Sequence, residues 1–361
     1  MKPSLIQTKN YPILLSSQIG EQLDEFLEDK SYASIFLLMD ENIMEHCWPI
    51  LTKDTQNLKN AELIVIEPGE KQKDIEIAIQ LWQTLTEYHA DRSSLLINFG
   101  GGVISDLGGF VASTFKRGID FINIPTSLLA MVDASVGGKT GINLLHYKNQ
   151  VGVFNQPQAI FIQTTFLSTL DRRQLVNGYA EMLKHGLIAD VKHWDELIQI
   201  QDITAENIQA SVEKSIHIKK DIVGQDPLEK GIRKSLNFGH TMGHIIESWS
   251  LDHDKKSLLH GEAIAIGIIL ESYLSRSIGL SEKHFELIKN HINKMFPKYQ
   301  ISSELINNFE EYLNQDKKKK GKEYNFTFVA EIGSHQINQN CSLKEIKESL
   351  IYYKENCSCL I

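Results

Sequence analysis

The sequence predicts an α/β protein in two parts, a parallel-sheet domain over residues 1–165 followed by a helical domain over residues 166–361. In the first part, short apolar, β-rich runs alternate with amphipathic helical patterns. After Leu170 strand-like runs nearly vanish and long helical patterns dominate. Alternating strands and helices are typical of a parallel sheet with helical connections. A length of 361 residues fits two domains that each bury a core.

Short runs in the first part are expected to be buried parallel strands, because they are rich in Ile, Leu, Val and Phe and are bounded by polar residues, Gly or Pro. These runs are 34–39, 63–66, 94–98 and 119–124. A connecting helix is expected within 71–90, where Ile75, Ile79, Trp82 and Leu85 recur three or four residues apart.

The second part is expected to be helical, with one strand near its end. Helical patterns cover 172–189, 205–223, 235–249, 261–278 and 281–294. A lysine-rich turn at 316–321 leads into a strand at 324–329. The domain boundary therefore rests on the change of pattern near residue 165.

Composition excludes several classes of protein. Hydrophobic residues make up 42% and charged residues 23%, which is typical of a folded chain. The formal net charge of −9 opposes nonspecific binding to nucleic acid or anionic lipid. Residues 1–15 have no apolar core of signal-peptide length, and no run approaches about 18 apolar residues. We expect a cytoplasmic protein with neither a nucleic-acid nor a membrane partner.

The four cysteines also favour a cytoplasmic protein. Cys47, Cys341, Cys357 and Cys359 are too few, and too clustered at the C-terminus, for a secreted disulfide framework. Cys357 and Cys359 could be half of a metal site, but the second half is missing. We interpret this tail as ordinary reduced thiols.

Two features follow predicted strands where nucleotides commonly bind. Phe99-Gly-Gly-Gly-Val103 opens a helix, a setting in which backbone N–H groups approach a pyrophosphate closely. Ser105 stands where a G-x-G-x-x-G motif has its third glycine, so a simple tight turn is the alternative. Asp40 ends an earlier strand and could hold a ribose hydroxyl. Its alternative role is to cap the helix that starts at Glu41.

A polar loop at 125–140 has the make-up of phosphate- or sugar-binding loops. It combines two glycines with a carboxylate, a lysine and hydroxyl groups. Gly137-Gly-Lys-Thr140 resembles the end of a P-loop. The glycine expected six residues before Lys139 is missing, because Asp133 stands there, so an ordinary P-loop is rejected.

Three separated pieces could form a metal site. Glu181 and Lys184 are three apart on one helix face, and His240 and His244 are four apart on another. His260 opens a third helix. Two histidines and one carboxylate leave open positions on a divalent metal, as a catalytic zinc site requires. Because the chain has 13 histidines, ordinary core or surface histidines are the alternative.

Taken together, the motifs resemble the 3-dehydroquinate synthase family from about residue 40 to about residue 329. They lie in order at 100–106, 116–118, 125–140, 148–149, 180–184, 236–244 and 259–262. The resemblance implies a cytoplasmic, NAD-dependent and Zn²⁺- or Co²⁺-dependent cyclase of the shikimate pathway. It would convert 3-deoxy-D-arabino-heptulosonate 7-phosphate to 3-dehydroquinate and phosphate. It further implies a Rossmann-like nucleotide-binding domain, a helical metal-binding domain and a homodimer.

The resemblance also implies roles for individual residues. The metal ligands are Glu181, His240 and His260. The NAD site is lined by Asp40, Asn42, Glu70, Lys73, Gly101, Gly102, Val103, Asp106, Thr126, Ser127, Lys139, Lys148, Thr169 and Leu170.

For the substrate, the resemblance assigns a set of cations, amides and one carboxylate. Lys139, Asn149, Lys184 and His244 hold the phosphate, and Arg117 reaches it from a partner subunit. Lys219 and Arg233 take the carboxylate, and Asp133 and Asn237 hold ring hydroxyls. Lys148 and a late lysine, Lys318 or Lys317, complete the pocket. The alternative for Arg117 is a surface arginine, and most of the lysine run is expected to be a solvated turn.

The implied chemistry explains these residue types. Oxidation at C5 by NAD acidifies the neighbouring C–H, so phosphate leaves by β-elimination; NADH restores the alcohol, and the opened enol closes by an aldol step. The phosphate itself is expected to take the proton, since the motifs offer no obvious base. The guanidinium of Arg233 suits a planar carboxylate, whereas lysines act as point charges around phosphate.

Two departures and three rival functions remain. Gln163 stands where the family usually has aspartate, and the segment between His244 and His260 is longer than usual. Metal-dependent alcohol or glycerol dehydrogenases share the two-domain plan but have no use for so many substrate cations. Cyclases of sedoheptulose 7-phosphate act on a substrate without a carboxylate, whereas Arg233, Asn237 and Thr140 after Lys139 favour a substrate that has one. A non-catalytic relative is disfavoured because all three proposed ligands are present.

Overall fold

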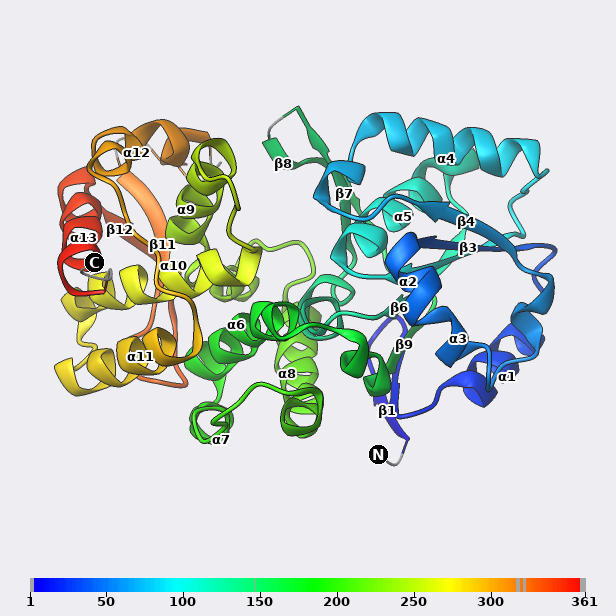
Figure 1. Cartoon of the computed structure of the whole chain (residues 1–361), viewed down its shortest axis with the longest axis horizontal. Helices are drawn as coiled ribbons and strands as arrows, with labels where there is room; N and C mark the ends of the chain where they lie inside the picture. Colours follow the sequence, from blue (N-terminus) through cyan, green and yellow to red (C-terminus); the bar gives the residue numbers. More distant parts are fainter. Residues whose placement is uncertain (1–2, 146, 316–318, 321–322, 358–361) are drawn as a thin grey trace. The chain divides into compact units, whose positions relative to one another are not determined.

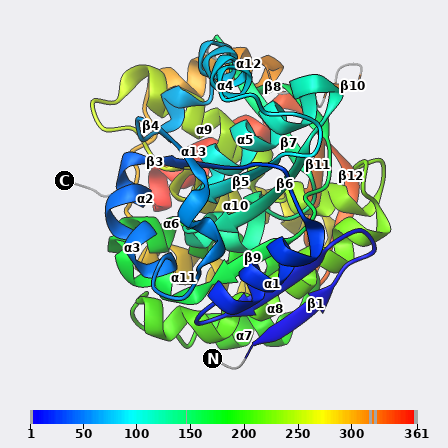
Figure 2. The same ribbon diagram turned by 90° about the vertical axis from the view of Figure 1, so that its right-hand side faces the viewer.

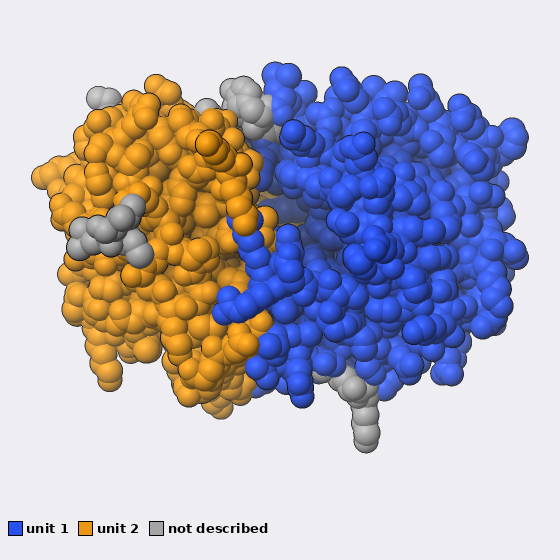
Figure 3. Space-filling view, viewed as in Figure 1, with its two compact units in different colours: residues 1–175, 204–220 blue, residues 176–203, 221–361 orange. Residues whose placement is uncertain are grey.

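The computed structural model describes residues 3–145, 147–315, 319–320 and 323–357. The chain forms two compact units, coloured separately in Figure 3. Unit 1 comprises residues 1–175 and 204–220, and unit 2 comprises residues 176–203 and 221–361. Compact packing does not show which segment performs which role, so the functional boundary at residues 165/166 stays a prediction.

Unit 1 is built on a seven-stranded sheet in the order β1-β2-β9-β6-β5-β3-β4. In Figure 2 the order can be followed from β4 through β3, β5 and β6 to β9. Every neighbouring pair is parallel except β1 with β2. The strands are β1 (Ser4–Gln7), β2 (Pro12–Ser16), β3 (Ile35–Asp40), β4 (Glu62–Ile66), β5 (Leu95–Gly100), β6 (Asp120–Pro125) and β9 (Ile160–Gln163). The predicted parallel sheet is confirmed.

Helices cover both faces of this sheet (Figure 1). On one face lie α4 (Ile75–Glu87) and α5 (Gly102–Thr114), joined by the ring contact of Trp82 with Phe110. On the other lies α1 (Gly20–Lys30), where Phe26 meets Phe161 of β9 edge to face. The short helices α2 (Glu41–His46) and α3 (Trp48–Leu51) follow β3. Apolar residues of α4 and α5 pack with those of β3, β5 and β6 into a core.

Unit 1 also contains a hairpin that the sequence did not predict. It consists of β7 (Lys139–Leu144) and β8 (Tyr147–Phe154), paired antiparallel. Its first residue is Lys139, so one of the predicted site lysines opens a strand. Asp133 lies just before it, in the π-helical turn Ala130–Ala134. The polar loop at 125–140 is therefore partly regular structure.

Unit 2 is mainly helical, as predicted. Its helices are α7 (Val191–Leu197), α9 (His240–His253), α10 (His260–Ser275), α11 (Glu282–Met295), α12 (Ser303–Gln315) and α13 (Leu343–Asn356). Two further helices are shared: α6 (Arg172–Ala189) lies mostly in unit 2, and α8 (Ala205–Gln225) lies mostly in unit 1. α9 packs along α10, and α10 also contacts α11 and α13. No helix within the described ranges is both long and apolar enough to span a membrane.

Two details of unit 2 differ from the sequence prediction. The helix predicted at 235–249 is a 3-10 turn, Ile232–Asn237, followed by α9, because Gly239 adopts φ +79 and interrupts the helix. The predicted strand at 324–329 is β11 (Glu323–Phe328), but it pairs with β10 (Lys319–Lys320) and β12 (Gln336–Cys341). The sequence of β12, Gln-Ile-Asn-Gln-Asn-Cys, is too polar to show the alternation of a half-buried strand.

Candidate functional site

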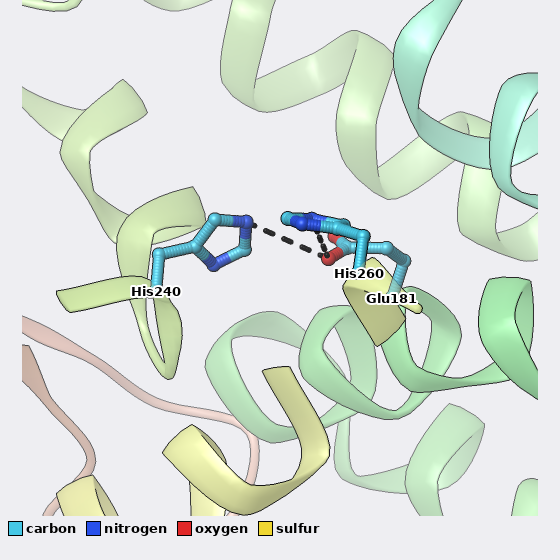
Figure 4. Close-up of side chains that lie close together, drawn as sticks. All are labelled: Glu181, His240 and His260. Atoms are coloured by element: carbon cyan, nitrogen blue, oxygen red, sulfur yellow. Dashed lines mark ion pairs between the residues drawn. The ribbon is translucent and has the colours of Figure 1, made fainter. Parts of the chain in front are cut away.

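Glu181, His240 and His260 come together in unit 2 from three different helices. Figure 4 shows both imidazoles directed at the carboxylate of Glu181. The Nε2 atoms of His240 and His260 lie 3.5 Å and 3.8 Å from Glu181 Oε1. One ligand atom from each residue falls within 4.8 Å of the other two. The structure therefore brings together the three side chains that the family resemblance assigned to the metal.

The other nitrogen of each ring is held by a hydrogen-bond acceptor. His240 Nδ1 lies 3.2 Å from the carbonyl oxygen of Phe238, and His260 Nδ1 lies 3.3 Å from Glu247 Oε2. Both partners only accept, so Nδ1 of each ring donates to them and Nε2 is the nitrogen directed at Glu181 and available to a metal. Second contacts of this kind orient metal-binding histidines. The donor set, N₂O with buried Glu181, fits Zn²⁺ or Co²⁺.

Lys184 lies one turn further along α6 and is almost completely buried. Its ammonium group forms an ion pair with Glu181 Oε2, so the carboxylate is flanked by imidazoles on one side and a cation on the other. His244 lies one turn along α9 from His240, and their ring centroids are 5.4 Å apart. Lys184 and His244, both predicted to bind phosphate, thus border the three candidate ligands.

Arg233 is buried in the 3-10 turn that precedes α9. The carboxylate of Asp226 stabilises this turn through hydrogen bonds. Its Nη1 donates to the carbonyl oxygen of Pro227 at 2.6 Å. Asp226 accepts backbone N–H bonds from Lys230, Gly231 and Arg233. Desolvation acts to raise the pKa of Asp226, but these N–H groups outweigh it and hold the pKa below its usual range. The loop therefore presents Arg233 in a fixed position.

Asn237, the other predicted substrate residue of this segment, is also held. Its Nδ2 donates to Glu229 Oε1 at 2.6 Å. Glu229 has φ +58. Lys234 fixes the same turn to β12 through Asn338 Oδ1, 3.1 Å away.

In unit 1, the loop after β5 leads straight into α5. The N-cap of α5 is Gly101, which has no side chain to occupy the first N–H groups of the helix. Gly102 and Val103 are the first helical residues, and Thr126 follows the neighbouring strand, donating its N–H to the carbonyl of Gly100 at 3.0 Å. Such a helix start fits a pyrophosphate group. Ser127 instead accepts the N–H of Ala130.

Asp40 adopts the alternative role that the sequence allowed. Its side chain accepts the N–H of Ile43 at 3.0 Å and caps α2, while Asn42 is exposed within that helix. Burial raises the pKa of Asp40, although the N–H groups of Ile43 and Asn42 oppose that rise. The cap uses one oxygen of the Asp40 carboxylate, so contact of Asp40 with a ribose hydroxyl stays a prediction.

A polar network joins several of the predicted NAD residues. Lys73 Nζ pairs with Asp106 Oδ2 at 2.6 Å and also contacts Asn149 Oδ1. Asn143, which the sequence analysis missed, donates to Glu70 Oε1 and accepts the N–H of Asn149. Burial raises the pKa of Asp106, and the ammonium of Lys73 opposes that rise. Asn149, assigned to the substrate phosphate, here belongs to the Lys73 network.

The remaining predicted residues are more dispersed. Asp133 forms an ion pair with Lys219 of α8, both in unit 1. Thr169 donates to the carbonyl of Phe166 and lies 3.5 Å from Cys47 Sγ, and Leu170 follows it. Lys139 is exposed and Lys148 half-buried in the β7–β8 hairpin. Lys317 and Lys318 lie outside the described residues. Gln163 is buried at the end of β9 and donates to Thr165 Oγ1 at 2.9 Å.

Arg117 is exposed just before β6, with φ +70. It lines an open cavity of about 430 Å³ together with Arg92 and Asp120. This placement on the surface of unit 1 leaves open both the surface role and the role across a subunit interface.

Sequence reasoning also missed two carboxylates of unit 2. Glu247 lies three residues after His244 on the same helix, so its spacing could have indicated a contact near the histidines. Asp226 stands before proline and five residues before Gly231, a combination typical of a turn.

Comparisons with known proteins agree along nearly the whole chain. Sequence models described as 3-dehydroquinate synthase N-terminal and C-terminal match residues 63–177 and 178–319. A 3-dehydroquinate synthase of Parabacteroides distasonis is 41% identical over 347 residues, covering 95% of this chain and 98% of that protein.

Solved structures show the same fold. A 2-deoxy-scyllo-inosose synthase complexed with carbaglucose-6-phosphate, NAD⁺ and Co²⁺ has a TM-score of 0.84 at 22% identity, covering 97% of this chain and 99% of that one. A 2-epi-5-epi-valiolone synthase from Streptomyces hygroscopicus with NAD⁺ and Zn²⁺ has a TM-score of 0.81 at 22% identity, covering 98% and 99%. At this identity the likeness concerns the fold alone.

Proposed function

Because this chain belongs to the 3-dehydroquinate synthase family, we propose that it converts 3-deoxy-D-arabino-heptulosonate 7-phosphate to 3-dehydroquinate and phosphate. NAD and Zn²⁺ or Co²⁺ are its cofactors. The observation that carries the proposal most directly is the convergence of His240 and His260 on buried Glu181. The placement of Arg233 in a fixed turn supports a substrate that bears a carboxylate.

In unit 2 we assign Glu181, His240 and His260 to the metal, which would polarise hydroxyl and carbonyl oxygens of the substrate. The acceptors behind the two imidazoles orient each ring so that Nε2 is directed at the proposed metal position. Lys184 and His244 take the phosphate. Because Lys184 also pairs with Glu181, its charge offsets that of the carboxylate.

Arg233 takes the substrate carboxylate, for which a planar guanidinium offers two parallel hydrogen bonds. Its Nη1 bond to Pro227 and the Asp226 cap fix its approach before substrate arrives. Asn237 orients a ring hydroxyl through its amide.

In unit 1 we assign the start of α5 to NAD, which would accept a hydride from C5 and return it after phosphate has left. Gly101, Gly102 and Val103 supply backbone N–H groups for its pyrophosphate. Asp40 holds a ribose hydroxyl, and the ion pair of Lys73 with Asp106 joins the segment before α4 to α5. Asn42, Glu70, Thr126, Ser127, Thr169 and Leu170 complete the NAD assignment.

Among the residues of unit 1 that contact substrate, Lys139, Lys148 and Asn149 serve phosphate and the ring, Lys219 the carboxylate, and Asp133 a hydroxyl. Asp133 and Lys219 are already paired, so each fixes the orientation of the other. Lys318, or Lys317, is assigned to the same substrate. The protein acts in the cytoplasm as a homodimer in which Arg117 reaches the partner's phosphate site.

One assay tests this proposal. Purified protein with NAD, Zn²⁺ or Co²⁺ and the heptulosonate phosphate should release inorganic phosphate without net NADH, because the hydride is returned in each cycle. Steady accumulation of NADH would contradict it and favour a dehydrogenase. Faster phosphate release from sedoheptulose 7-phosphate would contradict the choice of substrate.

A further inference from the structure

Glu271 is a completely buried carboxylate in α10, outside every motif of the sequence. Its Oε2 accepts the backbone N–H of Gly239 at 2.7 Å, and its Oε1 accepts that of Met242 at 3.0 Å. These two amides belong to the N-cap and third residue of α9. In a capping box, side chains of the helix itself satisfy the same two positions. Here one carboxylate from another helix satisfies both.

The sequence of α9 explains why its cap comes from elsewhere. Gly239 has no side chain, and its φ of +79 is a conformation that favours glycine. α9 and α10 also approach at their backbones. A Cβ added to Gly267 would lie 1.9 Å from the carbonyl oxygen of Gly239. Gly267 and Glu271 are four residues apart on one face of α10, so this face supplies both the close approach and the cap.

The capped turn contains one of the proposed metal ligands. His240 is the first residue of α9 and lies between Gly239 and Met242. The carbonyl that accepts from His240 Nδ1 belongs to Phe238, immediately before the cap. Glu271 therefore holds the backbone on both sides of His240. Its negative charge also offsets the partial positive charge of the helix N-terminus, beside which a metal cation is to bind.

His260, the second histidine of the set, is the first residue of α10, the helix that carries Glu271. The carboxylate thus ties the turn of His240 to the helix of His260. We propose that Glu271 is a positioning residue that fixes His240 in the geometry required for metal binding. This proposal rests on the metal site proposed above. Glu271 acts through the backbone of α9 and does not touch the metal.

Glu271→Gln tests this role with little change of volume. An amide has one acceptor oxygen, and its NH₂ group would face a backbone N–H, so one of the two N–H groups loses its acceptor. The metal dissociation constant should rise roughly 10- to 100-fold, the usual effect of losing an outer contact of a metal ligand. The visible absorption spectrum of the Co²⁺-loaded protein should change as well, while NAD affinity stays the same.

Asp190→Ala is the control within unit 2 for the loss of a helix cap, because asparagine would keep the one oxygen that this cap uses. Asp190 Oδ1 also accepts two backbone N–H bonds, from Lys192 and His193 at the start of α7, a helix without a proposed ligand. This variant should lose thermal stability yet keep its metal affinity and Co²⁺ spectrum. If it weakens metal binding as much as Glu271→Gln, the effect is general destabilisation and the proposal is wrong. Unchanged metal affinity and spectrum in Glu271→Gln would also overturn it.

Hydrogen exchange on the unmodified protein tests the same coupling between the capped turn and the metal, even if Glu271→Gln does not fold. Saturating Zn²⁺ should slow exchange of the Gly239 and Met242 amides, because the opening that exposes them also displaces His240. The amides of Lys192 and His193 should not respond. No slowing, or equal slowing at both helix starts, would overturn the proposal. Failure of the unmodified protein to bind metal would instead contradict the proposed metal site itself.

Discussion

His260 Nδ1 lies 3.3 Å from Glu247 Oε2, and this contact fixes which ring nitrogen faces Glu181. Glu247 is buried on α9, whereas His260 begins α10, so the contact joins the two helices that carry the histidines. A carboxylate behind a histidine also increases the basicity of its other nitrogen. The site is therefore organised in part by a residue, Glu247, that is not itself a proposed ligand.

Replacing His260 tests the ligand set. His260→Ala leaves two of three proposed protein ligands, too few for tight and geometrically fixed binding. We expect bound metal and phosphate release to be lost together while the protein stays folded, because the His260 side chain is 29% exposed and contributes little to the core. Metal analysis after dialysis, with circular dichroism as the folding control, checks this. Full metal content with near-normal turnover would contradict the assignment.

Arg233→Lys tests recognition of the carboxylate. Lysine keeps the charge but loses the planar fork, so binding of the heptulosonate should weaken by about 1.5–3 kcal/mol if a charged hydrogen bond is lost. NAD affinity should hardly change. Calorimetric titration of both ligands measures the difference.

Arg276→Lys is the matched control for Arg233→Lys. Arg276 lies in the same unit, pairs with Glu282 and stacks near Tyr273, away from the proposed site. It should leave both affinities unchanged. If Arg233→Lys also binds the heptulosonate normally, the carboxylate lies elsewhere.

His291 of α11 should make the protein sensitive to acid. Burial lowers its pKa from 6.5 to about 4, with a smaller contribution from Lys294, and its Nε2 lies 2.9 Å from the hydroxyl of Tyr179. Between these values the unfolded chain binds a proton that the folded protein excludes, so stability falls as pH drops from about 6.5 to 4. The loss amounts to at most about 3 kcal/mol.

Urea unfolding at pH 7 and pH 4.5 measures this loss. His291→Phe removes the titrating group and should reduce the difference in unfolding free energy between the two pH values, whatever its effect at pH 7. His284→Gln, on the same helix but less buried, is the control and should retain the difference. An unchanged difference in His291→Phe would show that other groups cause the acid sensitivity.

The sequence predicts elements best where one periodicity dominates. β3, β5 and β6 are apolar runs and appear within about two residues of prediction. β9 has only four residues and β12 is polar, so neither gives a clear pattern, and their place is set by pairing with distant strands. The start of α9 was predicted too early because the left-handed conformation of Gly239 is not visible in a helical pattern.

The same distinction applies to the candidate site. Residue type and helical spacing made a metal site in this region possible, and the family resemblance selected Glu181, His240 and His260, which lie together. Glu271 lies 31 positions after His240 within an apolar helix, and only the packing of α9 on α10 joins it to His240. Long-range contacts of this kind leave no periodic pattern in the sequence.

The last prediction concerns assembly. Arg117 is exposed on unit 1, lines an open cavity and has φ +70, a conformation that costs energy for a residue with a side chain. If it serves the partner's phosphate site, the dimer is the catalytic unit. Arg117→Ala and His260→Ala homodimers should then both be nearly inactive. His260→Ala is preferable to a change at Lys184, whose loss would leave buried Glu181 without its cation.

Mixing the two variants distinguishes action in trans from action within one chain. A mixed dimer has one site with both an intact His260 and an intact Arg117 from the partner. Random association makes about half of all dimers mixed, so about one quarter of the sites should regain activity. Differently tagged subunits, co-purified in two steps, establish that mixed dimers form. If they form and no activity returns, Arg117 does not act across the interface, because cis action leaves every site of the mixed dimer lacking one of the two side chains.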